Sequence, residues 1–186
     1  MKDFIISHPM GELRIYHEPT KAFLSTQTGK ISLCDGNFYI TNRSLSEYRS
    51  WERFPKDFIF DCNKQYVESG GGLSQLMSIL TNNFNLKNRP IAIDPFNISL
   101  IIELLELGLE NGLSFKKTYR NEIRVYLERA NLLLDDTKVK FYNTTLSEAV
   151  DNNPELVHCA DFLIDVAGAS MYSMETYNNY RYKILK

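Results

Sequence analysis

The sequence predicts an α+β fold, in which an N-terminal antiparallel β-sheet of four to five strands packs against three to four C-terminal helices. Three observations lead to this prediction. Short apolar and β-branched segments dominate the first 66 residues, and longer segments with apolar residues at helical spacing follow residue 72. The chain has 186 residues, 44% of them hydrophobic and 24% charged, which is ordinary for one globular unit. We therefore expect a single domain over residues 1–186, β-rich at 1–66 and helix-rich at 72–169.

The N-terminal strands are predicted from short apolar runs that turn residues separate. Asp35-Gly36 lies between two such runs and predicts a tight hairpin, because both residues tolerate positive φ. Ser44 is typical of the N-cap of a short helix, which we expect over 44–53. The predicted strands are 3–7, 13–17, 30–34, 37–42 and 57–61.

The second half of the chain is predicted to be mainly helical. Asp94 and Pro95 are typical of a helix start, and Asn111-Gly112 is typical of a helix end. The helix between them, 95–110, is apolar nearly all round, so we expect it in the core, with Leu104 or Leu105 fully buried. The other predicted helices are 73–84, 117–134 and 154–169, and the other strands are 90–93, 138–142 and 177–185.

Composition limits the possible locations and partners. The formal net charge is −2, which gives no field strong enough to attract nucleic acid or an anionic membrane. No apolar segment is long enough to cross a bilayer. The three cysteines, Cys34, Cys62 and Cys159, cannot all pair and fit no disulfide framework. We therefore expect a cytoplasmic protein with reduced thiols and no membrane partner.

Gly70–Gly72 are the first candidate site. The backbone N–H groups of a glycine-rich loop before a helix can hold an anion. A phosphate-binding loop also needs a lysine and a hydroxyl residue directly after its last glycine, and here Leu73 and Ser74 follow. We expect a solvent-facing turn. The alternative is a small enzyme that acts on a nucleotide or phosphorylated substrate at the Gly70–Gly72 loop.

His158, Asp161 and Asp165 are the second candidate site. In a helix over 154–169 they would lie on one side, where a histidine and two carboxylates could bind a divalent cation. The sequence offers no further ligand cluster to complete such a site. Only Cys159 has a histidine beside it, and adjacent helical residues do not face each other. We therefore expect no metal and no catalytic residue.

Charge is distributed unevenly along the second half of the chain. A basic patch at 116–124 contains Lys116, Lys117, Arg120 and Arg124, and it would suit a nucleic-acid binder if the net charge did not disfavour that class. The segment 144–165 holds acidic residues and no lysine or arginine. We expect a surface there that binds a basic partner protein. Its predicted partner-binding residues are Glu148, Asp151, Glu155, Asp161 and Asp165.

These observations favour a non-enzymatic protein-binding module that inhibits another protein by occluding it. Toxin-neutralising immunity proteins and virus-encoded antagonists act in this way. The chain contains eleven tyrosines, and this side chain is enriched at protein interfaces. No set of polar residues has a spacing that catalysis, a metal or a cofactor requires, so we expect none of the three. The enzyme at the glycine loop and the nucleic-acid binder remain as alternatives.

Overall fold

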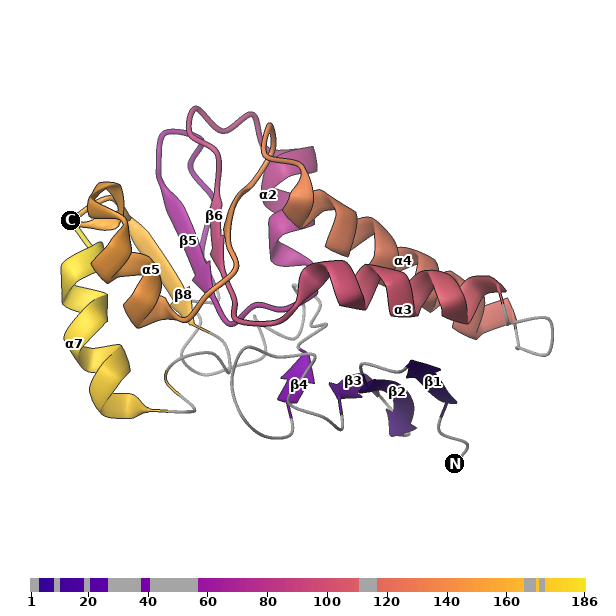
Figure 1. Cartoon of the computed structure of the whole chain (residues 1–186). Helices are drawn as coiled ribbons and strands as arrows, with labels where there is room; N and C mark the ends of the chain where they lie inside the picture. Colours follow the sequence, from indigo (N-terminus) through magenta and orange to yellow (C-terminus); the bar gives the residue numbers. More distant parts are fainter. Residues whose placement is uncertain are drawn as a thin grey trace.

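The computed structural model describes residues 4–8, 11–18, 21–26, 38–40, 57–110, 117–165, 170 and 173–186. The elements fall into two groups along the chain (Figure 1). The first group is four strands that pair in sequence order as antiparallel neighbours. They are β1 (Phe4–His8), β2 (Gly11–Glu18), β3 (Lys21–Thr26) and β4 (Phe38–Ile40).

The second group alternates strands with helices and contains a sheet of order β7-β6-β5-β8, in which all pairs are parallel. Its strands are β5 (Tyr66–Ser69), β6 (Ile91–Ile93), β7 (Lys140–Tyr142) and β8 (Phe162–Asp165). Its helices are α2 (Leu76–Asn83), α3 (Ile98–Glu110), α4 (Lys117–Leu134), α5 (Leu146–Asn152) and α7 (Met174–Ile184), with a 3-10 turn, η2 (Pro154–Leu156).

The predicted fold class is therefore wrong. The sheet that carries the helices is not an N-terminal antiparallel sheet but the parallel sheet of β5 to β8, which lies in the same part of the chain as the helices. Parallel neighbours need a crossover connection, and a helix after each strand supplies it. The prediction failed because β5 was not recognised as a strand and β8 was assigned to a helix.

Helices cover both faces of the parallel sheet (Figure 1). Adjacent residues of β5 point to opposite faces, as in any strand. Tyr66 joins the apolar cluster formed with α2, α3 and α4, and Val67 joins the cluster formed with α5 and α7. Both predicted core leucines of α3, Leu104 and Leu105, are fully buried. The second group is thus a three-layer α/β/α arrangement.

Several predicted elements agree with the structure and others do not. Helix 117–134 matches α4, while α3 starts at Ile98, where the Asn97 side chain accepts from the Leu100 N–H. The predicted helix 154–169 is wrong, because η2 and β8 occupy that segment, and the predicted strand 177–185 is the helix α7. Residues 57–61 form no strand. The predicted strand 30–34, the Asp35-Gly36 turn and the helix 44–53 lie outside the described residues.

Candidate functional site

The strand order of the parallel sheet reverses between β5 and β8, which are neighbours in the sheet. The chain steps from β5 to β6 to β7 in one direction, and β8 then pairs with the other side of β5. In open parallel sheets, ligands bind outside the carboxyl ends of the strands where the order reverses in this way. Ser69 pairs with Asp165 at these ends, so the loop after Ser69 lies at the reversal point.

The loop at this point is the glycine triplet. Gly70 and Gly72 have φ values of 67° and 55°, in the left-handed region that favours glycine. Three N–H groups of the loop donate within the chain. The Gly70 N–H donates to the Ile93 carbonyl at 2.9 Å, the Gly72 N–H to the Asp94 carboxylate at 2.8 Å, and the Ser74 N–H to the Gly71 carbonyl at 2.9 Å. Gly71 is buried, so the expected solvent-facing turn is instead a turn fixed to the end of β6.

Asp94 follows β6 directly and is 8% exposed. Burial is the main cause that raises the pKa of its carboxyl to about 7. Hydrogen bonds from the Gly72 and Phe96 N–H groups oppose the shift, and the negative charges of Glu68 and Asp165 add to it. Asn143, after β7, donates to the Asp94 and Phe96 carbonyls and holds this corner in place.

Glu68 is a second buried carboxylate of the site, only 2% exposed. The Ser74 hydroxyl lies 2.8 and 3.0 Å from its two carboxylate oxygens and donates to them. The carboxylate lies directly over Gly71: a Cβ atom there would be 2.2 Å from Glu68 Cδ. The middle glycine, Gly71, therefore leaves room for the Glu68 side chain.

Asp165 ends β8 and is the third carboxylate of the site. It accepts hydrogen bonds from the Ser170 hydroxyl at 2.6 Å and from the Ser170 N–H at 3.3 Å. Its charge acts on Asp94, and it also raises the pKa of Tyr177, after the larger effect of burial. Two carboxylates, Glu68 and Asp165, raise the pKa of Asp94, while the Arg129 guanidinium donates to the Leu73 carbonyl of the same loop at 2.8 Å.

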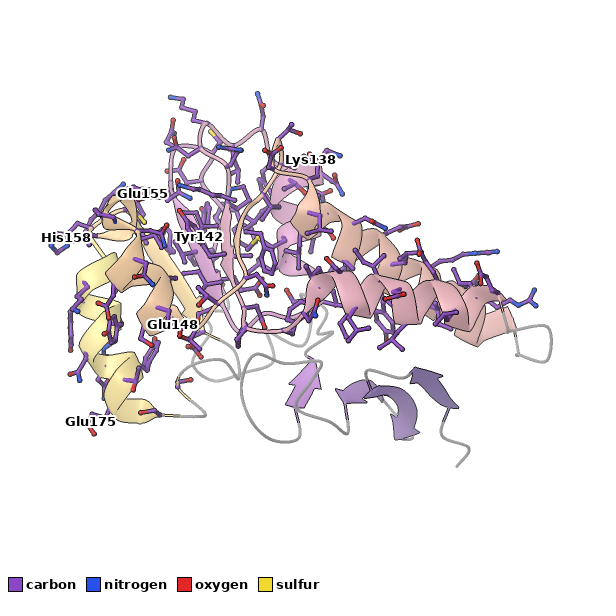
Figure 2. All side chains as sticks on the ribbon, viewed as in Figure 1. Lys138, Tyr142, Glu148, Glu155, His158 and Glu175 are labelled. Carbon is purple, nitrogen blue, oxygen red and sulfur yellow. The ribbon has the colours of Figure 1, made fainter. Side chains whose placement is uncertain are left out.

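Each of the predicted partner-binding residues has a local partner within the fold. Figure 2 shows Glu148 and Glu155 at separate places on the side of α5. Glu148 belongs to the capping box of α5, where it accepts from Thr144 and Thr145. Glu155 pairs with Lys140 at 3.2 Å and accepts from the Tyr142 hydroxyl at 3.0 Å. Each carboxylate is thus partnered within its own neighbourhood.

The remaining acidic residues are partnered as well. Asp151 pairs with Lys183 at 3.2 Å and accepts from the Tyr180 hydroxyl. Asp161 pairs with Lys186 at 2.7 Å and with Lys64 at 3.5 Å.

The predicted helical face of His158, Asp161 and Asp165 does not exist. His158 has a left-handed φ of 55° in the turn after η2, and Asp165 lies in β8. Within the described residues, no group of three or more His, Cys, Asp or Glu side chains could hold a metal ion.

The basic patch lies on α4 as far as it is described. Arg120 and Arg124 belong to this helix, while Lys116 and the Lys117 side chain lie outside the described residues. Arg124 borders an open groove of about 720 Å³ between α2 and α4. Glu128 and Asp135 also line this groove, so it carries both signs of charge.

No family model, curated protein or solved structure matches this chain. No helix in the described part is both long and apolar enough to cross a membrane. The sequence did contain signals for the site that were not used. Glu68 stands just before the glycines, and Asp94 directly follows the predicted strand 90–93, although it was interpreted only as a helix cap.

Proposed function

We propose that the carboxyl edge of the parallel sheet binds a nucleoside cofactor that carries a positive charge, and that S-adenosylmethionine is the cellular compound that fits it. One observation carries the proposal. A nearly buried carboxylate, Asp94, lies beside a left-handed glycine loop at the reversal point, where Glu68 and Asp165 raise its pKa. The proposal shares its place, the Gly70–Gly72 loop, with the predicted alternative of an enzyme for a nucleotide or phosphorylated substrate, but it differs in the ligand, which has no phosphate.

The nucleoside part is supported by topology and spacing. Doubly wound sheets bind dinucleotides beside a glycine-rich turn after one strand, and an acidic residue roughly 20 positions further on accepts from the ribose hydroxyls. Gly70 and Asp94 have a similar spacing, on adjacent parallel strands. The loop departs from the full G-x-G-x-x-G fingerprint, because Gln75 stands where its last glycine is expected.

Phosphate is disfavoured by hydrogen bonding and by charge. A pyrophosphate is bound by free N–H groups at the loop and the helix start. Here the Gly70, Gly72 and Ser74 N–H groups already donate to acceptors within the chain. A phosphate beside Asp94 would also be repelled by the charges of Glu68 and Asp165. ATP and nicotinamide dinucleotides therefore fit this loop poorly.

S-adenosylmethionine meets each requirement of the site. Its ribose supplies two hydroxyl donors for Asp94, its sulfonium and ammonium charges together exceed the charge of its one carboxylate, and it has no phosphate. When bound, it supplies a methyl group that a nucleophile can take, while the sulfur leaves as a neutral thioether. The residues of this chain would hold the ribose at Asp94 and stabilise the positive charge through Glu68 and Asp165. We infer a group-transfer enzyme of the methyltransferase type.

The test is a binding measurement by calorimetry at pH 8, with S-adenosylmethionine, S-adenosylhomocysteine, ATP and NAD as ligands. We expect the two adenosyl compounds to bind and the two phosphate compounds not to bind. Asp94→Asn keeps an acceptor for the Gly72 N–H but loses the charge. It should weaken adenosyl binding by roughly 10- to 100-fold, the value of a hydrogen bond to a charged group.

The matched control is Asp151→Asn, which removes an exposed carboxylate on α5 and should leave the affinity unchanged. Binding of ATP or NAD in preference to the adenosyl compounds, or no binding of any of the four, would contradict the proposal.

The predicted inhibitor of a partner protein stays a prediction. It has less support than before, because it relied on exposed carboxylates without local partners, and the five acidic residues each have one. A cytoplasmic location also stays a prediction. It is supported by Cys62 and Cys159, which are free thiols.

A further inference from the structure

An open groove lies between α2 and α4. It has a volume of about 720 Å³, and Gln75, Ser78 and Asn82 lie on its α2 side. The Arg129 guanidinium of α4 donates to the Leu73 carbonyl, just before α2, at 2.8 Å. This bond links the two sides of the groove directly.

The α4 side of the groove presents two opposite charges one helical turn apart. Arg124 and Glu128 both line the groove and are both exposed. No ion pair joins them among the described residues, and an arginine that precedes a glutamate by four positions is the less favourable order for such a pair. Further along α4, Asp135 is neutralised by Lys138, at 3.5 Å. The charges of Arg124 and Glu128 are therefore available to a partner.

Apolar side chains lie close to these two charges. Val125 borders the groove and is 39% exposed, and the partly buried Leu127 and Leu132 line the groove as well. An apolar centre with a polar rim is the usual arrangement of a protein interface. A partner that covers this face needs an apolar residue at its centre and opposite charges at matching positions, and α4 itself has both.

We propose that this groove is the interface of a homodimer, in which α4 of a second copy lies antiparallel to α4 across a twofold axis. In such an interface, residue i contacts residue j of the other copy, and j contacts i. An axis at position 126, midway between Arg124 and Glu128, places each arginine opposite the glutamate of the other copy, so the same ion pair forms twice.

The same axis also matches two exposed amides. Asn121 and Asn131 are five positions before and after 126, so each would lie opposite the other in the second copy. The Asn131 amide nitrogen donates to the Leu127 carbonyl at 3.0 Å, while its amide oxygen accepts from no group in the described part of the chain. An interface of one helix and its neighbour is small, so the dimer should dissociate on dilution. The proposal is independent of the proposed nucleoside site.

The test is sedimentation velocity of the full chain over a concentration series. We expect a reversible equilibrium between monomer and dimer. Arg124→Glu and Glu128→Arg each place like charges opposite one another, so each should weaken the dimer at least about tenfold. The matched control is Glu175→Arg on α7, which covers the other face of the sheet (Figure 2), and it should leave the dimer unchanged.

A mixture of the two single variants tests the twofold register. Arg124→Glu makes both positions acidic, and Glu128→Arg makes both positions basic, so each variant alone should be monomeric. Mixed in equal amounts, they should form a heterodimer, because both pairs across the axis again join opposite charges. The double exchange, Arg124→Glu with Glu128→Arg, should restore the homodimer for the same reason. Thermal unfolding of each variant establishes that the measured protein is folded.

Three results would overturn the inference. If the wild-type protein stays monomeric at every concentration, the groove is not a homodimer interface and is left to a different partner. If the folded single variants dimerise as well as wild type, the dimer forms through another surface. If the single variants are monomeric and their mixture does not associate, the two charges do not meet across a twofold axis.

Discussion

At the scale of single residues, the pKa of the Asp94 carboxyl depends strongly on the fold. A carboxyl after a strand is ordinarily ionised at neutral pH, but burial, together with the charges of Glu68 and Asp165, raises the pKa of this one to about 7. Between the ordinary value of 3.8 and about 7, the folded state holds a proton that the unfolded state has lost. Stability therefore falls as pH rises through this window, by up to about 1.4 kcal/mol per pH unit, and is level above it.

We predict that Asp94→Asn, which cannot ionise, removes this pH dependence. The Tm of the variant minus the Tm of the wild type should increase from pH 5 to pH 7.5 and stay constant above that. Thermal unfolding in a buffer series measures it. Asp151→Asn is the control, because the Tyr180 hydroxyl lowers the pKa of Asp151, so that this residue stays ionised over the whole series. A difference for Asp94→Asn that is independent of pH would mean that Asp94 is ionised throughout.

The same residues indicate what the sequence could reveal about the site. The glycine triplet is a candidate on sequence alone, and its missing lysine argues against a phosphate-binding loop of the lysine type. Glu68 and Ser74 were not recognised, because their meeting over Gly71 requires the left-handed turns at Gly70 and Gly72. The hydrogen bond between the Gly72 N–H and the Asp94 carboxylate could not be inferred without the parallel pairing of β5 and β6.

At the scale of elements, Asp161 joins three parts of the chain. It precedes β8, accepts from the Gln65 N–H before β5 at 2.8 Å, and pairs with Lys64 and with Lys186 at the end of the described chain. The hydrogen bond from Lys186 is the main cause that lowers the pKa of Asp161 to about 2. A carboxyl group whose pKa is lowered by folding stabilises the folded state at pH values above its ordinary pKa of 3.8. This stabilisation is lost as the pH falls toward 2.

We predict that Asp161→Asn lowers the Tm at pH 7, and that the difference from wild type shrinks as pH is lowered from 5 toward 2. Asparagine can still accept from the Gln65 N–H, so the decrease in Tm measures the contribution of the ion pairs with Lys64 and Lys186. Asp136→Asn, an exposed carboxylate for which no ion pair is found among the described residues, should leave the Tm unchanged at every pH. An unchanged Tm for Asp161→Asn at pH 7 would mean that the two ion pairs do not stabilise the fold.

Two elements were predicted with the wrong type, for identifiable reasons. Leu156, Ala160 and Leu163 have helical spacing, but the first two are buried in the core around α5, and the third lies in β8. The tyrosines of 177–185 favoured a strand, yet α7 forms there. Ser173 caps it by accepting from the Thr176 N–H, and Arg181 lies in its last turn, where a cation is favourable. These capping signals were present in the sequence.

At the scale of the whole molecule, the order of predicted elements already favoured a parallel sheet. Helix 73–84, strand 90–93, two helices and strand 138–142 alternate in the manner of α/β folds. The antiparallel prediction gave more weight to the N-terminal apolar segments. The decisive strands β5 and β8 have only four residues each, which is too short for periodicity to distinguish a strand from a helix.

The apolar helix α3 is where the sequence and the structure agree on the core, and it provides the test of the whole arrangement. Leu104 and Leu105 are fully buried, and both belong to the cluster that joins α2, α3 and α4 to the Tyr66 face of the sheet. Truncation of such a leucine to alanine costs roughly 2–5 kcal/mol, a large part of the roughly 5–15 kcal/mol of a typical domain.

We predict that Leu104→Ala and Leu105→Ala each lower the free energy of unfolding by roughly 2–5 kcal/mol. Urea unfolding measures this loss, and the m-value should not change. Glu106→Ala, at an exposed position of the same helix, should change the free energy of unfolding by less than about 0.5 kcal/mol. The proposed nucleoside site is formed by loops at the carboxyl edge of the sheet, so each leucine variant should still bind S-adenosylhomocysteine under conditions where it is folded. If both leucine variants have a free energy of unfolding within about 0.5 kcal/mol of wild type, α3 does not lie in the core, and the three-layer arrangement that positions Glu68 and Asp94 is incorrect.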